Sequence, residues 1–422
     1  MGIKQDMIDS IESQRDDGIR MLQALVRAAS PNPPGETTAA AAVLANYLTS
    51  KGIHHKLISP KQGQPNIVSE FEGGSGPGPR VVLNGHMDVF PVDLSAGGWQ
   101  RDPWSGDIAD GRIHGRGVVD MKSGTASMVI AYQHLYEQRK HLKGTVALCM
   151  VSDEETGGAW GTRYLLQEDK ARWGGDVMLT AEPTGRTIRF SEKGTLRLTA
   201  TVRTKGGHGA YPNLSKGAIR TAASFLSEVT EAVTSMEVDT LPDIARHLTD
   251  PEVLKAVDRA MGEGTSTIIA RPTVNVGTIR GGVKVNVIPE LCTFELDIRL
   301  PIGLTAEEVL ELIHALAQNH TKATIEIEKQ DAASNPSSYS TISHPIIGHL
   351  AHNAKQVIPD YPATLIPSMG ATDCKHYRYA GIPAYAYGCS PFSMAAVNES
   401  ASISEFVQVT KVLAGAVCDF LA

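Results

Sequence analysis

The chain has 422 residues, enough for two domains, and its 42% hydrophobic and 20% charged residues are those of an ordinary globular protein. This composition excludes disordered, collagen-like and coiled-coil proteins, and the net charge of −7 argues against a general nucleic-acid or membrane-surface binder. No stretch approaches the ~18 apolar residues of a membrane helix and the polar N-terminus lacks a signal-peptide core, so we expect a cytoplasmic protein.

The first half of the chain alternates predicted helices with short, continuously apolar strands. Helices are expected at 37–50 and 122–138, and strands at 81–83, 145–151 and 176–180. Continuous apolar strands separated by helices indicate a mostly parallel sheet that is covered on both faces. A further strand at 66–70 is expected to add an edge to this sheet.

The pattern changes near residue 192. Segments 195–203 and 291–299 alternate apolar and polar residues, which is typical of strands with one solvated face. Helices are expected at 217–233 and 305–318 and a strand at 325–327, and we assign this range the βαββαβ order of a ferredoxin-like α+β domain, although these segments supply only three of its four strands. The α/β pattern then returns. We predict one α/β domain formed by residues 1–191 and 331–422, with the second domain inserted at 192–330.

Histidine and acidic residues stand at strand ends or open a helix in the first domain. They occur in four motifs: His86 with Asp88, Asp120 after a glycine turn, Asp153 with Glu154 and Glu155, and Glu182. In open parallel sheets ligands bind at the carboxyl ends of the strands, so the motifs point to one cleft. Each motif alone is equally typical of a helix cap or a solvated surface. Together they suit a divalent metal such as zinc, manganese or cobalt.

The motifs resemble those of the M20 metallopeptidase and deacylase family, which includes acetylornithine deacetylase, succinyl-diaminopimelate desuccinylase and glutamate carboxypeptidase. The resemblance covers nearly the whole chain through GHMDVFP (85–91), GRGVVDMKSG (115–124), SDEETGG (152–158), AEP (181–183), GGHGAYP (206–212), NVIPELCTFELDIR (286–299) and GATDCKHYRYAGIP (370–383). It implies that the first domain is catalytic. The inserted domain would be a lid and dimerisation domain, in at least a homodimer.

The resemblance also implies metal ligands. His86 and Glu182 would bind a first metal, Glu155 a second, and Asp120 would bridge the two. Asp88 would orient His86 as a carboxylate behind the ligand. The substrate would be a small molecule that carries a carboxylate, with no role for nucleic acid or membrane.

Catalytic and substrate-binding roles follow from the same resemblance. Glu154 would be the general base, and His208 would reach the partner subunit's active site to stabilise the oxyanion. Two further pairs match positions that hold or contact the substrate, namely Asn286 and Arg299 in the lid and Gly370 and Ala371 in a late loop.

One family motif is broken. A histidine that binds the second metal is expected shortly before Asn398 and Glu399, but Ala395 stands in its place. The second site would then keep only Asp120 and Glu155, so we expect one metal per subunit, firmly or labilely bound, beside a weakened second site. Three late side chains are open as substitutes for the missing ligand: Cys374, His376 and Cys389.

Three functions are consistent with these residues. The first is hydrolysis of an amide by an N-acyl amino acid deacylase or dipeptidase. The second is displacement of the amino group of an electron-poor aromatic amine by a single labile metal, as in the family's 5-nitroanthranilate aminohydrolase. The third is a non-catalytic binding relative, against which the retention of Glu154 and His208 argues. Release of ammonia or of a free amine separates the first two.

Overall fold

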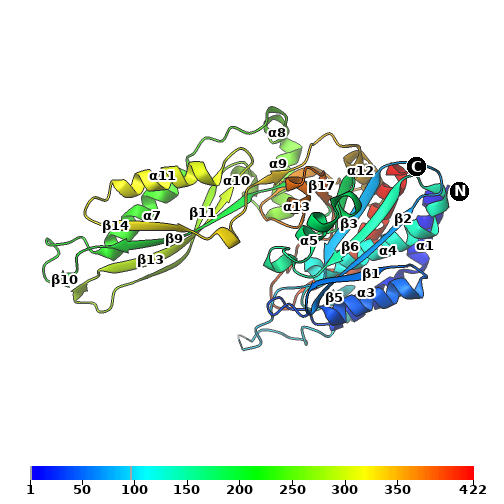
Figure 1. Ribbon diagram of the computed structural model, residues 1–422, viewed down its shortest axis with the longest axis horizontal. Helices are drawn as coiled ribbons and strands as arrows, with labels where there is room; N and C mark the ends of the chain where they lie inside the picture. Colours follow the sequence, from blue (N-terminus) through cyan, green and yellow to red (C-terminus); the bar gives the residue numbers. More distant parts are fainter. Residues whose placement is uncertain (1, 96) are drawn as a thin grey trace.

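The computed structural model describes residues 2–95 and 97–422 and has two bodies, drawn on the right and left of Figure 1. The larger body contains both ends of the chain, and the smaller one is formed by its middle (Figure 1). This arrangement confirms the expected fold class, an α/β unit with an inserted α+β unit. No helix in the described ranges is both long enough and apolar enough to cross a membrane.

The larger body is built on a mixed sheet with the strand order β1-β2-β6-β3-β7-β17-β8-β15, and β16 pairs with β8. Its strands are β1 (Lys56–Lys61), β2 (Gln64–Glu72), β3 (Arg80–His86), β6 (Thr145–Val151), β7 (Val177–Thr180), β8 (Ile188–Glu192), β15 (Ser338–Tyr339), β16 (Leu365–Ser368) and β17 (Ala384–Ala386). The four central strands β6, β3, β7 and β17 run parallel. The carboxyl ends of these strands therefore meet at one edge of the sheet.

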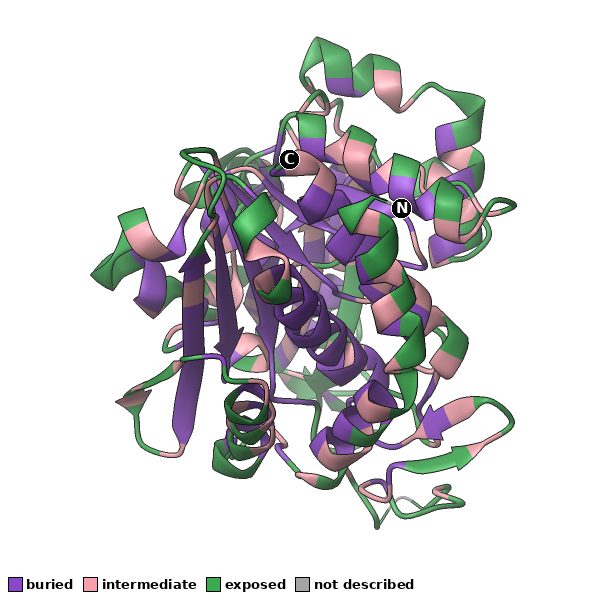
Figure 2. Ribbon diagram, turned by 90° about the vertical axis from the view of Figure 1, so that its right-hand side faces the viewer, coloured by how far each residue is buried: buried purple, intermediate pink, exposed green. Residues whose placement is uncertain are grey.

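The central strands bury both faces, as their continuous apolar sequence predicts. Val81 and Val146 belong to one hydrophobic core, while the next residues along the strands, Val82 and Ala147, belong to another. Helices on the first face are α1 (Ile3–Ser13), α2 (Arg15–Arg27), α3 (Thr38–Ser50), α4 (Ser123–Glu137), α12 (Pro345–Val357) and α14 (Ile403–Phe420); on the second, α5 (Thr162–Glu168), α6 (Lys170–Trp173) and α13 (Cys374–Tyr379). Figure 2 shows the buried strands running through this body.

The strand expected at 66–70 is longer and lies one place further inside the sheet than predicted. β2 pairs with β6 on one side and with β1 on the other, so β1 is the edge strand. β1 is mostly exposed and contains Pro60, and both features are those of an edge strand. For the same two reasons β1 is not recognisable as a strand in the sequence.

A small antiparallel sheet joins distant parts of the chain next to the central sheet. It has the order β18-β5-β4, with β4 (Asp107–Ala109), β5 (Arg112–His114) and β18 (Ser400–Ser402). Its pairing of Ser400 with His114 holds the segment before α14 beside the glycine turn that precedes Asp120.

The smaller body is an antiparallel sheet with the order β11-β13-β9-β14. Its elements are β9 (Gly194–Arg203), α7 (Ala218–Thr234), β11 (Thr273–Gly281), β13 (Leu291–Leu300), α11 (Ala306–Gln318) and β14 (Thr324–Lys329). Alternate residues of β9 and β13 pack against the two helices in one core, and the others face away. A capping box between Thr305 and Glu308 starts α11. This is the ferredoxin-like order expected from the sequence.

Three short helices inside the range 192–330 pack on the larger body. They are α8 (Pro242–His247), α9 (Pro251–Met261) and α10 (Thr265–Ile268). Val253 and Val257 of α9 share a hydrophobic cluster with Ile366 of β16. The division of the chain at residues 191/192 and 330/331 stays a prediction, and these helices show that contacts with the larger body extend into the inserted range.

Candidate metal and catalytic site

His86 is the last residue of β3 and is almost fully buried. Its Nδ1 atom lies 2.8 Å from the backbone oxygen of Asp88. Because a carbonyl oxygen only accepts, Nδ1 carries a proton, and Nε2 is the ring nitrogen that faces Asp120 and would bind a ligand once it is deprotonated. The second nitrogen is therefore the one available to a ligand.

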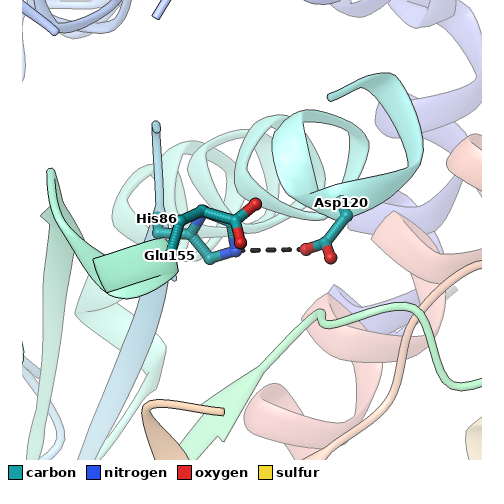
Figure 3. A group of neighbouring side chains, drawn as sticks. All are labelled: His86, Asp120 and Glu155. Carbon is teal, nitrogen blue, oxygen red and sulfur yellow. Dashed lines mark hydrogen bonds and ion pairs between the residues drawn. The ribbon is translucent and has the colours of Figure 1, made fainter. Parts of the chain in front are cut away.

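Carboxylates surround this nitrogen. Nε2 of His86 lies 3.2 Å from Oδ1 of Asp120, 3.6 Å from Oε1 of Glu182 and 4.0 Å from Oε2 of Glu154. Glu155 completes the group, because a ligand atom from each of His86, Asp120 and Glu155 lies within 4.8 Å of the other two. Figure 3 shows these three side chains turned toward one another from three different segments. The predicted ligands of the first domain are thus brought together.

Parallel strands explain why these residues meet. His86 ends β3, Glu154 and Glu155 follow the end of β6, and Glu182 follows the end of β7. β3 is hydrogen-bonded to both of its neighbours in register, with His86 opposite Val151. The three strand ends therefore lie side by side at one edge, as the position of ligand sites in open α/β sheets requires.

The cluster holds more negative charge than the protein around it balances. Burial raises the pKa of Glu154 to about 8, against the pull of Lys375, and raises that of Glu155 to about 10. Burial lowers the pKa of His86, but hydrogen bonds with Asp120 and Asp88 outweigh it and leave this pKa above its ordinary value. Carboxylates that are crowded together and buried from water tend to take up protons. A divalent cation bound among them would neutralise the same charge in place of those protons. The donor set, one imidazole and several carboxylates, fits such an ion.

Asp88 does more than face the histidine. Its carboxylate Oδ1 is 3.5 Å from Nδ1 of His86, further than the backbone oxygen. The same carboxylate accepts hydrogen bonds from the backbone N–H groups of Glu154 and Glu155, each at 3.2 Å. Asn32 donates to it as well, at 2.8 Å. Asp88 thereby fixes the turn that carries both glutamates relative to the imidazole.

Asp120 is held by a residue that the sequence reasoning missed. The Glu399 carboxylate accepts hydrogen bonds from the backbone N–H groups of Gly117, Val119 and Asp120, at 3.1, 2.9 and 3.4 Å. Its charge is balanced by Arg116 at 2.6 Å, and both side chains are buried. The only sequence signal was an acidic residue in the late family motif, which gives no hint of a partner 280 residues earlier.

Replacement of Glu399 by alanine is expected to destabilise the protein by about 3–5 kcal/mol, because it leaves the Arg116 charge buried without a partner. Loss of the support behind Asp120 should also weaken metal binding by about 10–100-fold. Chemical denaturation and metal titration measure the two effects. Glu70→Ala is the control: it breaks pairs with Arg80 and Arg172 that are partly exposed, so it should cost about 1 kcal/mol. Unchanged metal affinity in Glu399→Ala would contradict the proposed support.

Lys375 is a second residue that the sequence did not reveal. Its ammonium nitrogen lies 3.8 Å from Oε1 of Glu154 and 3.1 Å from the backbone oxygen of Thr372, which accepts its hydrogen bond. The side chain is largely buried at the start of α13. Its nearest acidic neighbours, Glu154 and Asp373, raise the pKa of Lys375 although burial lowers it. The lysine therefore stays charged beside the predicted base.

The late residues proposed as replacements for the missing histidine do not join the cluster. Among the residues that the structure describes, His86, Asp120 and Glu155 form the one tight ligand group. His376 instead lies 3.1 Å from the backbone oxygen of Gly157 and 3.7 Å from Asp373. Cys374 and Cys389 are buried, and burial raises the thiol pKa of both to about 12. Among the described residues, none of these three side chains would therefore supply a third ligand to the predicted second metal site.

Ala395 lies in an exposed turn next to the cluster. Its backbone has φ 59°, in the left-handed region, and Arg116 donates to the backbone oxygen of the following residue, Ala396, at 3.2 Å. The preceding residue, Met394, lines the same cavity as Asp120. The segment that matches the family's histidine motif therefore lies close to the site, although Ala395 stands in place of the histidine.

The predicted lid residues lie away from the cluster. His208 is exposed on β10 (Gly207–His208), which pairs with β12 (Val287–Ile288) at the end of the smaller body furthest from the large sheet (Figure 1). Asn286 is next to it and accepts a hydrogen bond from Gly209 at 2.8 Å. Arg299 lies on β13, paired with Asp297 at 2.9 Å. Within one chain His208 and Asn286 therefore lie at the end of the smaller body that is remote from His86, whereas Arg299 also donates to Thr195 near the start of β9, at 3.0 Å.

A cavity of about 350 Å³ opens beside the cluster, and we call it the central cavity. Its lining residues come from both halves of the larger body and from α9: Asp120, Glu182, Pro183, Thr184, Arg189, Glu192, Ala260, Met261, Ser368, Met369, Gly370, Ala371, Thr372, Ala386, Pro391 and Met394. Gly370 and Ala371, predicted as substrate contacts, are among them. The volume is that of a site for a small molecule.

Comparison with known proteins agrees with this architecture. The chain is similar to human carnosine dipeptidase 1 (17% identity, TM-score 0.75, covering 100% of this chain and 99% of the other). It is similar to an M20-family metallo-carboxypeptidase from Sulfolobus solfataricus (19%, 0.74, 96% and 99%) and to a dinuclear metal-binding M20 peptidase from Bacillus subtilis (14%, 0.62, 97% and 99%). With sequence identities this low, the structural similarity shows a shared fold and nothing about the reaction.

The family assignment comes from the sequence itself. Residues 82–419 match Peptidase family M20/M25/M40, a span that contains every ligand of the cluster and the whole inserted body. The chain therefore belongs to peptidase family M20/M25/M40 and is a hydrolytic enzyme that acts on C–N bonds.

Proposed function

We propose that the protein is a metal-dependent hydrolase that cleaves an amide bond in a small, carboxylate-bearing substrate, as an N-acyl amino acid deacylase or a dipeptidase. The observation that carries this proposal is the cluster of carboxylates around Nε2 of His86, with Glu154 beside it. A divalent transition metal held by His86, Asp120 and Glu182 would lower the pKa of a water molecule and polarise the substrate carbonyl.

The protein's own groups would then move the proton. Glu154 Oε2 lies at the edge of the cluster and would accept a proton from the attacking water, then return it to the nitrogen of the leaving amine. Two contacts hold the glutamate in place: its backbone N–H donates to Asp88, and Lys375 lies against its other oxygen. The lysine favours the ionised carboxylate that must accept the proton.

A screen of the metal-loaded protein tests this function. Zinc, manganese and cobalt forms would be incubated with N-acyl amino acids, dipeptides and aromatic amines, and free amine and ammonia measured separately. Amine release from an N-acyl amino acid or a dipeptide is the expected result. If none of these substrates is turned over in a metal-dependent way, the proposal is contradicted and a non-catalytic binding relative is favoured.

Aminohydrolysis of an electron-poor aromatic amine is the second candidate, and the observation that favours it is Ala395. A centre with one labile metal would still activate water, and such a substrate also carries a carboxylate. Release of ammonia without an acyl product in the same screen would select this reaction over amide hydrolysis.

The position of His208 supports a homodimer or larger homo-oligomer in which the lid of one subunit serves the site of the other. His208 is remote from its own cluster and exposed at the end of the smaller body. Exposed apolar side chains surround the same end, with Val283 at 90% and Val285 at 102% of full exposure. Such a surface fits contact with another subunit.

Mixing two inactive variants tests this arrangement. Glu154→Ala removes the base and His208→Ala removes the lid imidazole, but a mixed dimer contains one site with both groups. Random pairing should restore roughly a quarter of the unmodified protein's specific activity. Each variant assayed alone is the control. If mass spectrometry detects mixed dimers and no activity returns, His208 does not act across the subunit boundary.

A further inference from the structure

Arg189 is a buried cation that the proposed chemistry does not use. It lies on β8, is 5% exposed and lines the central cavity together with Asp120 and Glu182. Burial lowers the pKa of Arg189 to about 10, so the guanidinium remains protonated at neutral pH. A positive charge thus stands in the wall of the cavity that contains two predicted metal ligands.

This charge has no acidic partner among the residues that the structure describes. Within residues 2–95 and 97–422, the guanidinium donates only to uncharged acceptors: the backbone oxygens of Pro367 at 2.8 Å and Thr184 at 3.0 Å, and the sulfur of Met261. An arginine has five N–H donors, and the Nε donor has no partner here. Buried charges are normally paired, since an unpaired one is costly. The unbalanced guanidinium is therefore suited to an anion that enters the cavity.

Two other buried arginines of the region are paired with carboxylates, while the buried Lys122 and Lys193 donate to backbone oxygens and do not line the central cavity. Arg378 lies 3.2 Å from Glu192, and Arg116 pairs with Glu399. Arg299, the predicted carboxylate holder of the lid, makes two contacts of 2.9 and 3.0 Å with Asp297. Arg189 differs from these arginines in lacking a carboxylate and in lining the central cavity.

The other residues that line the central cavity indicate the chemistry of the rest of the ligand. Three methionines, Met261, Met369 and Met394, line the cavity beside Arg189. Methionine side chains adapt to apolar groups of different shape. A ligand that fits has a carboxylate for the guanidinium, an apolar portion for the thioethers, and an amide that reaches Asp120 and Glu182.

We propose that Arg189 binds a carboxylate of the substrate inside the central cavity and makes the enzyme select small amides that carry both a carboxylate and an apolar side chain. This inference rests on the proposed function, since it assigns specificity to that reaction. It places recognition of the anion in the same subunit as the metal ligands, in addition to any contact from a lid. Arginine suits the task because its planar fork binds carboxylates with two hydrogen bonds.

Binding measurements test the proposal without turnover. In the Glu154→Gln background, which should hydrolyse its ligands at least about 10²-fold more slowly, calorimetry would compare three probes: N-acetyl-leucine, neutral N-acetyl-leucinamide, and N-succinyl-leucinamide, whose carboxylate is on the acyl side. With Arg189 present, at least one carboxylate probe should bind tenfold or more tightly than the neutral one. Which probe does so tells whether the amine side or the acyl side carries the recognised group.

Variants then assign the preference to Arg189. Arg189→Gln should abolish the preference while leaving affinity for N-acetyl-leucinamide within about threefold, and Arg189→Lys should keep part of it. The matched control is Arg186→Gln, because Arg186 lies on the same segment but pairs with Glu405 at 3.5 Å. It should leave the preference intact. A merely structural role for Arg189 would weaken all three probes equally.

Two results would overturn the proposal. One is the absence of any carboxylate preference when Arg189 is present; the other is an unchanged preference in Arg189→Gln. If that variant does not fold, Arg189→Lys decides, since a full preference in the lysine form would exclude recognition by the arginine fork. Failure of the proposed function is distinguishable. Arg189-dependent binding without hydrolysis of any amide contradicts only the function, and hydrolysis without such binding contradicts only this inference.

Discussion

Replacement of Glu154 by glutamine is expected to lower kcat by about 10²–10⁴, the range for loss of a general base. The side chain lies 4.0 Å from the His86 nitrogen and is held by Asp88 through its backbone, so the amide should occupy the same place. It cannot accept a proton. Because His86, Asp120, Glu155 and Glu182 are untouched, metal content should change little. Steady-state kinetics and metal analysis of the same preparation measure both quantities.

Glu154→Asp separates the missing proton acceptor from a disturbed site. It restores a carboxylate that is one methylene too short, so part of the activity should return while the metal content stays the same. Lys375→Met gives a second comparison, since it removes the ammonium group 3.8 Å from the base and leaves the base in place. Near-normal turnover of Glu154→Gln would show that another residue accepts the proton.

The metal cluster could be predicted from the sequence because every signal in it is local. β3, β6 and β7 each contain a short apolar run; His86 ends β3, and acidic residues stand within four positions of the ends of β6 and β7. Buried parallel strands place their carboxyl ends together whatever the loops between them do. The proximity of His86, Glu155 and Glu182 could therefore be predicted without knowing any tertiary contact.

The residues that support the cluster could not be predicted in this way. Glu399 acts on the turn before Asp120 only because β18 pairs with β5, and three-residue strands leave no periodic pattern. Lys375 opens a short helix on the opposite face of the sheet and reaches Glu154 only in the folded chain. Arg189 is one cation in a mixed strand, and its lack of a carboxylate partner is visible only in three dimensions.

The strand β11 and the short helices that follow α7 were not predicted from the sequence, and the reason in each case is local. The strand β11 contains Gly277, and its pairing with β13 shifts register between Val276 and Thr278, which breaks the alternation that marked β9 and β13. The short helix α9 carries apolar residues that pack against Ile366 of β16. The sequence analysis predicted no helix there, and the body on which these residues pack is visible only in the folded chain.

Replacement of Ala395 by histidine is expected to raise the metal content from about one ion per chain toward two. The predicted first site would have three protein ligands, His86, Asp120 and Glu182, which is the number typical of a catalytic metal site, whereas the predicted second site would have only Asp120 and Glu155. The backbone at Ala395 has φ 59°, a conformation that histidine adopts more readily than most residues. An imidazole there should be tolerated. Metal analysis after dialysis against metal-free buffer measures the change.

Ala396→His is the matched control, because it puts the same imidazole one residue along the same exposed turn, where the family motif has no ligand. It should leave the metal content near one. The expectation depends on weak binding at the second site: two carboxylates hold a transition metal less firmly than a set that includes imidazole. If the unmodified protein keeps two ions through dialysis, some other group completes the second site and the single-metal interpretation is wrong. If it keeps one and Ala395→His keeps two, the missing imidazole alone accounts for the weakened site.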